Sequence, residues 1–126
     1  MIPRRVVLDT NVVFAALYSD RGASHQVLRL VERGQLTPCL SVPLLLEYEQ
    51  VLRRRRTDLE RTPEEIDVVL DYLCARSVRQ DIFFLWRPYL KDPKDDMLLE
   101  VAVASGARFL ITHNIKHFVG VERMGV

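Results

Sequence analysis

RVVLDTNVV, residues 5–13, joins a run of apolar residues to an acid, a hydroxyl and an amide. The apolar part, Val6-Val7-Leu8, is typical of a strand that is buried on both faces, as in a parallel sheet. Asp9 follows directly at the carboxyl end of this strand, which is where ligands bind in open α/β sheets. Since aspartate also begins turns and caps helices, Asp9 alone leaves a structural role and an active-site role equally open.

The composition is that of an ordinary globular chain. Its 126 residues are enough for one compact domain with a buried core, and 48% of them are hydrophobic and 28% charged. The net charge of +1 argues against a strongly basic coat protein, but an acidic site can cancel basic surroundings in an enzyme that acts on nucleic acid. No apolar run approaches the ~20 residues of a membrane span, and no signal peptide precedes the first strand. We therefore expect a cytoplasmic protein with no membrane contact.

Strand and helix signals alternate along the rest of the chain. We expect helices at 12–17, 23–33 and 44–54, from Pro63 onward and from Pro93 to Gly106, with strands at 36–42, 77–85 and 108–112 and a helical turn at 115–118. This order predicts an α/β domain, an α/β/α sandwich around a central, mainly parallel sheet. Cys39 and Cys74 lie far apart in apolar stretches, so we expect both to be reduced core residues.

Two helix starts carry clear capping signals. Thr62, Pro63 and Glu65 form a capping box with proline in the first turn. Asp92 before Pro93 is a plausible cap. Because one helix start needs one cap, Asp95 and Asp96 exceed the structural requirement, although acids in a first turn are mildly favourable.

Three acidic positions stand where a parallel sheet can bring them together. Asp9 ends a strand, Glu47 lies in the first turns of a helix that follows a strand, and Asp95 begins a helix that leads to another strand. The helical pattern does not decide between Glu47 and Glu49. A carboxylate cluster without histidine or cysteine favours Mg²⁺ or Mn²⁺ over zinc. Such a site can hydrolyse a phosphodiester through metal-bound water.

Several cationic and aromatic residues could contact nucleic acid. Arg53, Arg54, Arg55 and Arg56 form either a solvated helix end or a phosphate-contacting patch, and His113 and Lys116 follow the last strand within possible reach of a phosphate. Trp86 and Tyr89 could stack on bases, but packing is the favoured interpretation. His113 and His117 are four residues apart, which only weakly suggests zinc.

The chain resembles the PIN-domain family, and more narrowly the PIN-family toxins of prokaryotic toxin–antitoxin pairs. The resemblance spans residues 6 to about 118. It rests on Leu8-Asp9-Thr10-Asn11-Val12, Pro43-Leu44-Leu45-Leu46-Glu47-Tyr48, Val51-Leu52-Arg53-Arg54, Asp92-Pro93-Lys94-Asp95-Asp96, Ala104-Ser105-Gly106-Ala107 and Leu110-Ile111-Thr112-His113-Asn114.

The resemblance implies an Mg²⁺- or Mn²⁺-dependent endoribonuclease with an RNA substrate, a small antitoxin partner and a homodimeric state. It selects Glu47 over Glu49 and assigns the catalytic and metal-binding acids as Asp9, Glu47 and Asp95, with polar support from Thr10, Asn11, Asp96, Thr112 and Asn114. Asn114 stands where many members carry a fourth acid.

A further strand and a short helix usually follow the last motif, and residues 120–126 would supply only the start of that strand. The alternatives are a catalytically weak or inactive PIN-like module that binds RNA or protein, and a phosphatase.

Overall fold

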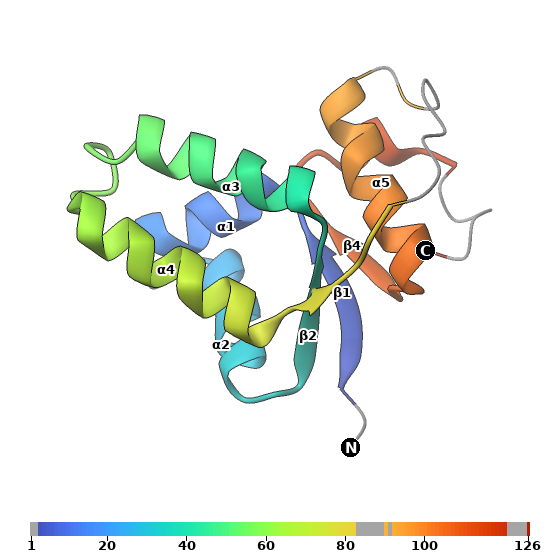
Figure 1. Cartoon of the computed structure of the whole chain (residues 1–126), viewed down its shortest axis with the longest axis horizontal. Helices are drawn as coiled ribbons and strands as arrows, with labels where there is room; N and C mark the ends of the chain where they lie inside the picture. The colour runs from blue at the N-terminus through green and yellow to red at the C-terminus, as the bar shows by residue number, and fades with distance from the viewer. Residues whose placement is uncertain (1–2, 83–89, 91, 121–125) are drawn as a thin grey trace.

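A four-stranded sheet forms the centre of the computed structural model, which describes residues 3–82, 90, 92–120 and 126. Its order is β3-β2-β1-β4, and every neighbouring pair is parallel (Figure 1). The strands are β1 (Arg4–Leu8), β2 (Leu36–Leu40), β3 (Val78–Arg79) and β4 (Phe109–Ile111). The helices are α1 (Thr10–Tyr18), α2 (Ala23–Glu32), α3 (Val42–Arg54), α4 (Pro63–Arg76) and α5 (Pro93–Ser105), followed by the 3-10 turn η1 (Ile115–Phe118).

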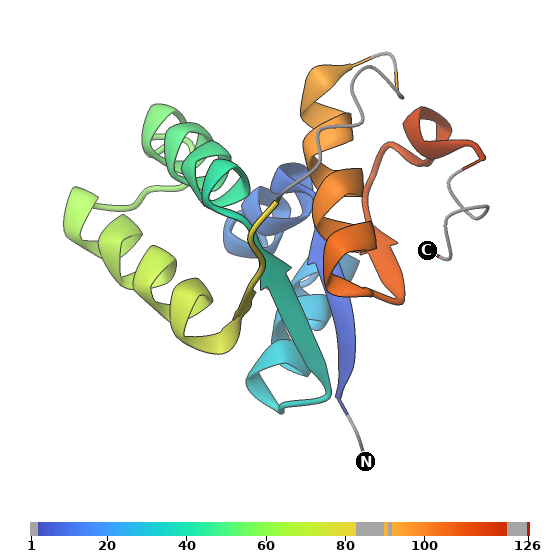
Figure 2. The same cartoon turned by 45° about the vertical axis from the view of Figure 1, so that its right-hand side comes forward.

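The helices cover both faces of the sheet. The chain steps from β1 to β2 and on to β3 in one direction, and then returns past both strands to β4. Because parallel crossovers are right-handed, the first two place α1 to α4 on one face and the return places α5 on the other (Figures 1 and 2). This confirms the predicted α/β/α sandwich. No helix in the described ranges is long and apolar enough to cross a membrane.

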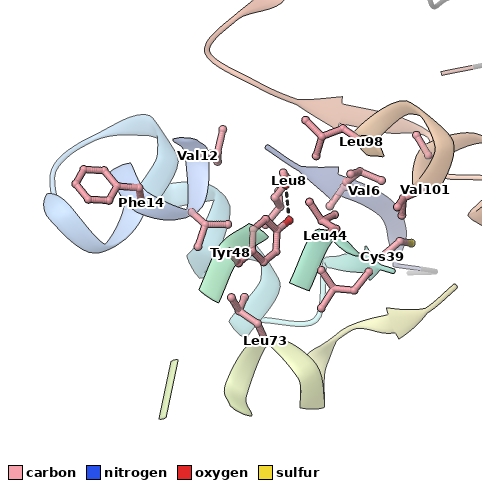
Figure 3. Packing of buried hydrophobic residues seen from close by; sticks show 14 of the residues in the cluster. Val6, Leu8, Val12, Phe14, Cys39, Leu44, Tyr48, Leu73, Leu98 and Val101 are labelled. Atoms are coloured by element: carbon pink, nitrogen blue, oxygen red, sulfur yellow. Dashed lines mark hydrogen bonds between the residues drawn. The ribbon is translucent and has the colours of Figure 1, made fainter. Parts of the chain in front are cut away.

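Strand β1 runs through the middle of the core. Val6 and Val7 are fully buried and Leu8 is nearly so, as expected for a strand covered on both faces. The buried side chain of Tyr48, from α3, contacts the end of this strand, where its hydroxyl donates a hydrogen bond to the Leu8 carbonyl (Figure 3). Leu98 packs into the same core from α5.

The predicted end of the second strand was wrong. The apolar pattern suggested a strand up to Val42, but β2 ends at Leu40. Ser41 is the N-cap of α3 and its hydroxyl accepts a hydrogen bond from the Leu44 amide at 3.2 Å. Pro43 therefore lies inside the first turn of the helix, where its missing N–H costs nothing.

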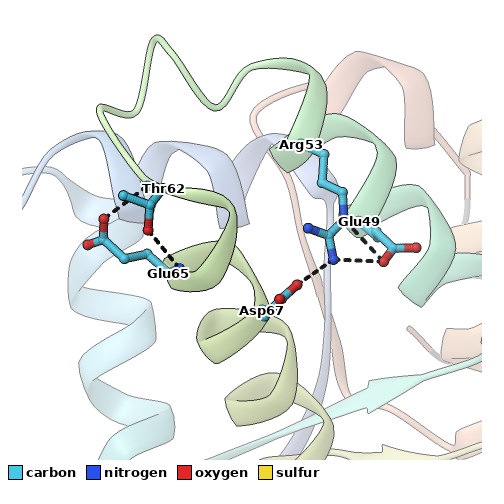
Figure 4. Close-up of polar contacts among 5 residues, drawn as sticks. All are labelled: Glu49, Arg53, Thr62, Glu65 and Asp67. Atoms are coloured by element: carbon cyan, nitrogen blue, oxygen red, sulfur yellow. Dashed lines mark hydrogen bonds and ion pairs between the residues drawn. The ribbon is translucent and has the colours of Figure 1, made fainter.

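The capping box predicted at the start of α4 is confirmed, whereas α1 begins at Thr10, two residues before the predicted start. Thr62 accepts from the Glu65 amide at 3.1 Å, and the Glu65 carboxylate accepts from the Thr62 amide at 2.9 Å (Figure 4). α4 then packs against α3, and the two helices form a helical hairpin.

Cys39 and Cys74 have different surroundings, and the structure describes only part of the strand predicted at 77–85. Cys39 is fully buried, but the expectation that Cys74 is a core residue was wrong, since it lies on the exposed side of α4. The strand predicted at 77–85 was too long, since β3 covers only Val78–Arg79 and residues 80–82 are not in a strand. Residues 83–85, Trp86 and Tyr89 lie outside the described residues, as does most of 120–126.

Candidate active site

Asp9 occupies a helix start without using its side chain as a cap. It is the N-cap residue of α1, yet its carboxylate makes no capping hydrogen bond. The Asp9 amide is held by the Ile111 carbonyl at 2.9 Å, and its Oδ2 accepts a hydrogen bond from the Thr112 hydroxyl at 2.6 Å. With 7% of its surface exposed, Asp9 is a nearly buried carboxylate fixed at the meeting point of β1 and β4.

The carboxylates of Asp92 and Asp95, both at the start of α5, have different partners. The Asp92 carboxylate caps the helix by accepting from the Lys94 amide at 3.0 Å. The Asp95 side chain is left for another role, and its Oδ2 lies 2.9 Å from Nδ1 of His117. Burial raises the pKa of the Asp95 carboxyl above its ordinary value, and the charges of Asp92 and Asp9 add to this effect while His117 opposes it.

Glu47 and Glu49 face different surroundings on α3. The Glu47 side chain is 14% exposed, and its Oε1 lies 3.8 Å from Nζ of Lys94. Glu49 instead receives two hydrogen bonds from Arg53, which also binds Asp67 of α4 at 2.6 Å (Figure 4). Glu49 therefore belongs to a surface ion-pair cluster between α3 and α4.

One polar pocket brings the three predicted acids together. It has a volume of about 200 Å³. Its lining residues are Asp9, Thr10, Asn11, Glu47, Val51, Arg54, Arg55, Asp92, Lys94, Asp95, Met97, Leu98, Asn114 and His117. The acids come from three elements that are distant in sequence, and they meet at the carboxyl end of β1, where an open α/β sheet places its ligand site.

The carboxylate and amide oxygens of the pocket suit a hard cation in their chemistry, but the side chains that carry them lie apart. Carboxylates together with an asparagine amide are ligands that Mg²⁺ and Mn²⁺ prefer. Among the residues that the structure describes, no group of three or more histidine, cysteine or acidic side chains is close enough to hold a metal ion as it stands. Asp9 and Asp95 are each held by a hydrogen bond, and Glu47 is paired with Lys94.

The four consecutive arginines separate into two pairs. Arg54 and Arg55 line the pocket. Arg55 also lies over the Phe14 ring at 3.9 Å from its centroid and pairs with Asp58. Arg53 is engaged by the acids between α3 and α4, while Arg56 donates to the Arg61 carbonyl.

The supporting residues expected from the sequence also divide. Thr10, Asn11 and Asn114 line the pocket, and Thr112 binds Asp9 from its edge. Three others do not line it. Asp96 is buried and accepts from the Leu90 amide at 2.7 Å, His113 pairs with Ser24 at 2.9 Å, and Lys116 is exposed on η1.

Sequence reasoning missed three residues of this site. His117 contacts Asp95, Lys94 lies beside Glu47, and Tyr48 supports the backbone in front of Asp9. The signal for Lys94 was its place between Asp92 and Asp95 in a first helical turn. No local pattern distinguishes His117 from His113, because their roles depend on how the chain turns after β4.

Comparisons with known proteins agree with this fold. No curated protein sequence matches the chain. A crystal structure of VapBC2 from Rickettsia felis, bound to a DNA fragment from their promoter, matches with a TM-score of 0.62 at 19% sequence identity. That match covers 95% of this chain and 92% of the other. The sequence model of the PIN domain matches residues 5–116, a range that holds Asp9, Glu47 and Asp95, and the chain therefore belongs to the PIN domain family.

Proposed function

We propose that this protein is a divalent-metal-dependent endoribonuclease that hydrolyses RNA phosphodiester bonds. The observation that carries this proposal is the meeting of Asp9, Glu47 and Asp95 in one polar pocket that is also lined by arginine. Carboxylates attract a cation, and cations at the rim attract the phosphates of a polynucleotide. A binding site for a small neutral molecule would need neither feature.

Each acid has a distinct part in holding Mg²⁺ or Mn²⁺. Asp9 and Asp95 are held by Thr112 and His117, so they supply the fixed side of the site, and Glu47 completes it from α3. The bound cation would activate a water molecule and stabilise the oxygen that leaves the phosphorus. Thr10, Asn11 and Asn114 offer neutral oxygen and amide groups beside the acids, which can orient water without adding charge.

Arg54 and Arg55 are the arginines suited to an RNA phosphate. Both line the pocket, and arginine binds phosphate oxygens with a planar, bidentate donor set. Lys94 of α5 also lines the pocket, 3.8 Å from Glu47, and its charge would attract an incoming phosphate as well. His113 and Lys116 follow β4 and do not line the pocket, so they are weaker candidates for contact with RNA.

The biological role that best fits is the toxin of a toxin–antitoxin pair. One solved structure with the same fold is a VapBC2 complex, which supports a small antitoxin protein as partner. A homodimer and a cytoplasmic location complete this proposal. Copurification with the product of a neighbouring small gene, and light scattering of the purified chain, test the partner and the dimer.

Glu47 and Glu49, two glutamates of α3, provide a matched pair of variants that tests the enzymatic function. Purified wild-type protein and its variants are incubated with RNA and with DNA in Mg²⁺, in Mn²⁺ and in chelator. We expect metal-dependent RNA cleavage that Asp9→Asn and Glu47→Gln abolish and Glu49→Gln retains, because Glu49 belongs to the ion pairs between α3 and α4. Absence of cleavage by wild-type protein under every divalent condition would refute the enzymatic proposal.

A catalytically weak or inactive module that binds RNA or protein is the second candidate. Two observations favour it. In the described part of the chain, no three acidic, histidine or cysteine side chains are close enough to hold an ion. Asn114, which lines the pocket, stands where many family members carry a fourth acid. RNA binding that is unchanged by chelation and by Asp95→Asn, without cleavage, would support this candidate over the first.

A further inference from the structure

The segment that follows β4 connects two of the acids in the pocket. At its start, Thr112 donates to Oδ2 of Asp9 at 2.6 Å. At its end, Nδ1 of His117 lies 2.9 Å from Oδ2 of Asp95. Residues 112–117 therefore bridge β1 and α5, two elements that are otherwise separate in sequence, and we refer to them as the bridging segment.

The bridging segment is held in shape by its own backbone. The Asn114 amide donates to the Thr112 hydroxyl at 2.9 Å, and the His117 amide donates to the Asn114 carbonyl, also at 2.9 Å. The next residue, Phe118, is 5% exposed and belongs to the core cluster. The His117 ring thus extends from a short turn that is fixed at both ends, which limits the positions that its Nδ1 can take.

Each of the two acids is bound through one oxygen atom. The hydrogen bonds use Oδ2 of Asp9 and Oδ2 of Asp95. Among the described residues, no protein hydrogen bond reaches Oδ1 of either side chain. A carboxylate that is anchored at one oxygen presents the other in a defined direction, and such outer partners are known to set the orientation of metal ligands.

We propose that His117 is a positioning residue that anchors the Asp95 carboxylate, so that its second oxygen is presented to the divalent cation of the site. This inference rests on the proposed function, since it assigns a role toward the metal. The role does not depend on the charge of the ring, because the neutral tautomer with a proton on Nδ1 and the imidazolium both donate to a carboxylate.

A surface ion pair of no consequence is the alternative interpretation, and the burial argues against it. The His117 side chain is 49% exposed, but the Asp95 side chain is only 9% exposed. Asp92 already satisfies the helix start, so Asp95 has no capping duty that would hold it. Without the His117 hydrogen bond, the buried Asp95 carboxylate could adopt other orientations.

Affinity for Mn²⁺, measured by titration calorimetry on full-length protein, tests the role without relying on catalysis. We expect His117→Ala to weaken Mn²⁺ binding about tenfold or more, as for other outer partners of metal ligands. His117→Asn places an amide donor near the position of Nδ1 and should restore most of the lost affinity. His117→Gln places its donor near Nε2 instead and should not. His113→Ala, in the same segment but paired with Ser24, should bind Mn²⁺ as wild-type protein does.

Thermal unfolding of each variant separates loss of fold from loss of position, and His117→Asn keeps the test valid if the alanine variant does not fold. Wild-type affinity in His117→Ala, equal losses in His117→Ala and His113→Ala, or rescue by Gln rather than Asn would overturn the inference. If wild-type protein binds Mn²⁺ and cleaves RNA while His117→Ala binds equally well, only this inference fails. If wild-type protein binds no Mn²⁺, the proposed function fails and the inference fails with it.

Discussion

Replacement of Tyr48 by phenylalanine removes one atom from the support of the candidate site. The Tyr48 side chain is 1% exposed, and its hydroxyl donates to the carbonyl of Leu8, the residue before Asp9 (Figure 3). Beyond Leu40 the neighbouring strand β2 turns into α3, so the sheet no longer serves this carbonyl. The hydroxyl of Tyr48 takes over the task at the point where the strand ends and the acid begins.

The expected cost follows from the burial of both partners. A typical hydrogen bond contributes about 1 kcal/mol net, and a buried group left without a partner costs about 1–3 kcal/mol. Since Leu8 is 3% exposed, water cannot replace the lost donor without disturbing the core. We expect Tyr48→Phe to lower the free energy of unfolding by about 2 kcal/mol.

The cost should be the same across the working pH range. Burial raises the pKa of the Tyr48 hydroxyl well above its ordinary value, and the nearby charge of Asp9 raises it further. The hydroxyl is therefore protonated and donating at every pH at which the protein is handled. Urea denaturation of wild-type protein and Tyr48→Phe at acidic, neutral and mildly alkaline pH measures this.

Tyr18 provides the control, because it is 64% exposed. Tyr18→Phe should change the free energy of unfolding by less than about 0.5 kcal/mol, as for most surface substitutions. A loss below about 0.5 kcal/mol in Tyr48→Phe, or an equal loss in Tyr18→Phe, would show that this hydroxyl does not support the strand end. A loss that varied strongly with pH would refute the assignment of Tyr48 as a permanent donor.

Three further predictions concern other parts of the molecule. Thr62→Ala removes the capping hydroxyl of α4 and should cost about 1 kcal/mol of stability in urea denaturation. Asp95→Asn should stabilise the protein at neutral pH: the folded-state pKa of Asp95 is raised, so its ionised form destabilises the fold, and this cost disappears as pH falls through the raised pKa toward the ordinary value. An Asn variant that is less stable than wild type at neutral pH would contradict this. Lys94→Met should strengthen Mn²⁺ binding and weaken RNA binding, because Lys94 neutralises Glu47. Calorimetry and filter binding measure the two changes, and a shift of both in the same direction would exclude this role.

The elements that could be predicted from the sequence are those with local causes. The run Val6-Val7-Leu8 is apolar because the strand is covered on both faces. The Thr62 and Asp92 caps follow from side chains that bond amides two or three residues away. The end of β2 was misjudged because Val42 has strand propensity, while the Ser41 hydroxyl already serves the first turn of α3. A cap within an apolar run is easily missed.

The contacts of the site could be predicted less completely, because they join distant segments. Spacing placed Asp9 at a strand end and Asp95 at a helix start, and the family resemblance selected Glu47 over Glu49. All three acids line the same pocket. Spacing could not separate His113 from His117. Both follow β4 within a few residues, but only the turn of η1 places the His117 ring against Asp95 while His113 pairs with Ser24.

Asp9 and Asp92 show why a helix start can conceal an active-site acid. Both are acids at the N-cap position of a helix, and a local pattern gives them the same interpretation. The Asp92 carboxylate bonds the Lys94 amide two residues away. The Asp9 carboxylate makes no such bond and accepts from Thr112, which is 103 residues away. A competing donor from a neighbouring strand end therefore decides whether the carboxylate at a helix start caps the helix, and that donor can be recognised only once the order of the strands is known.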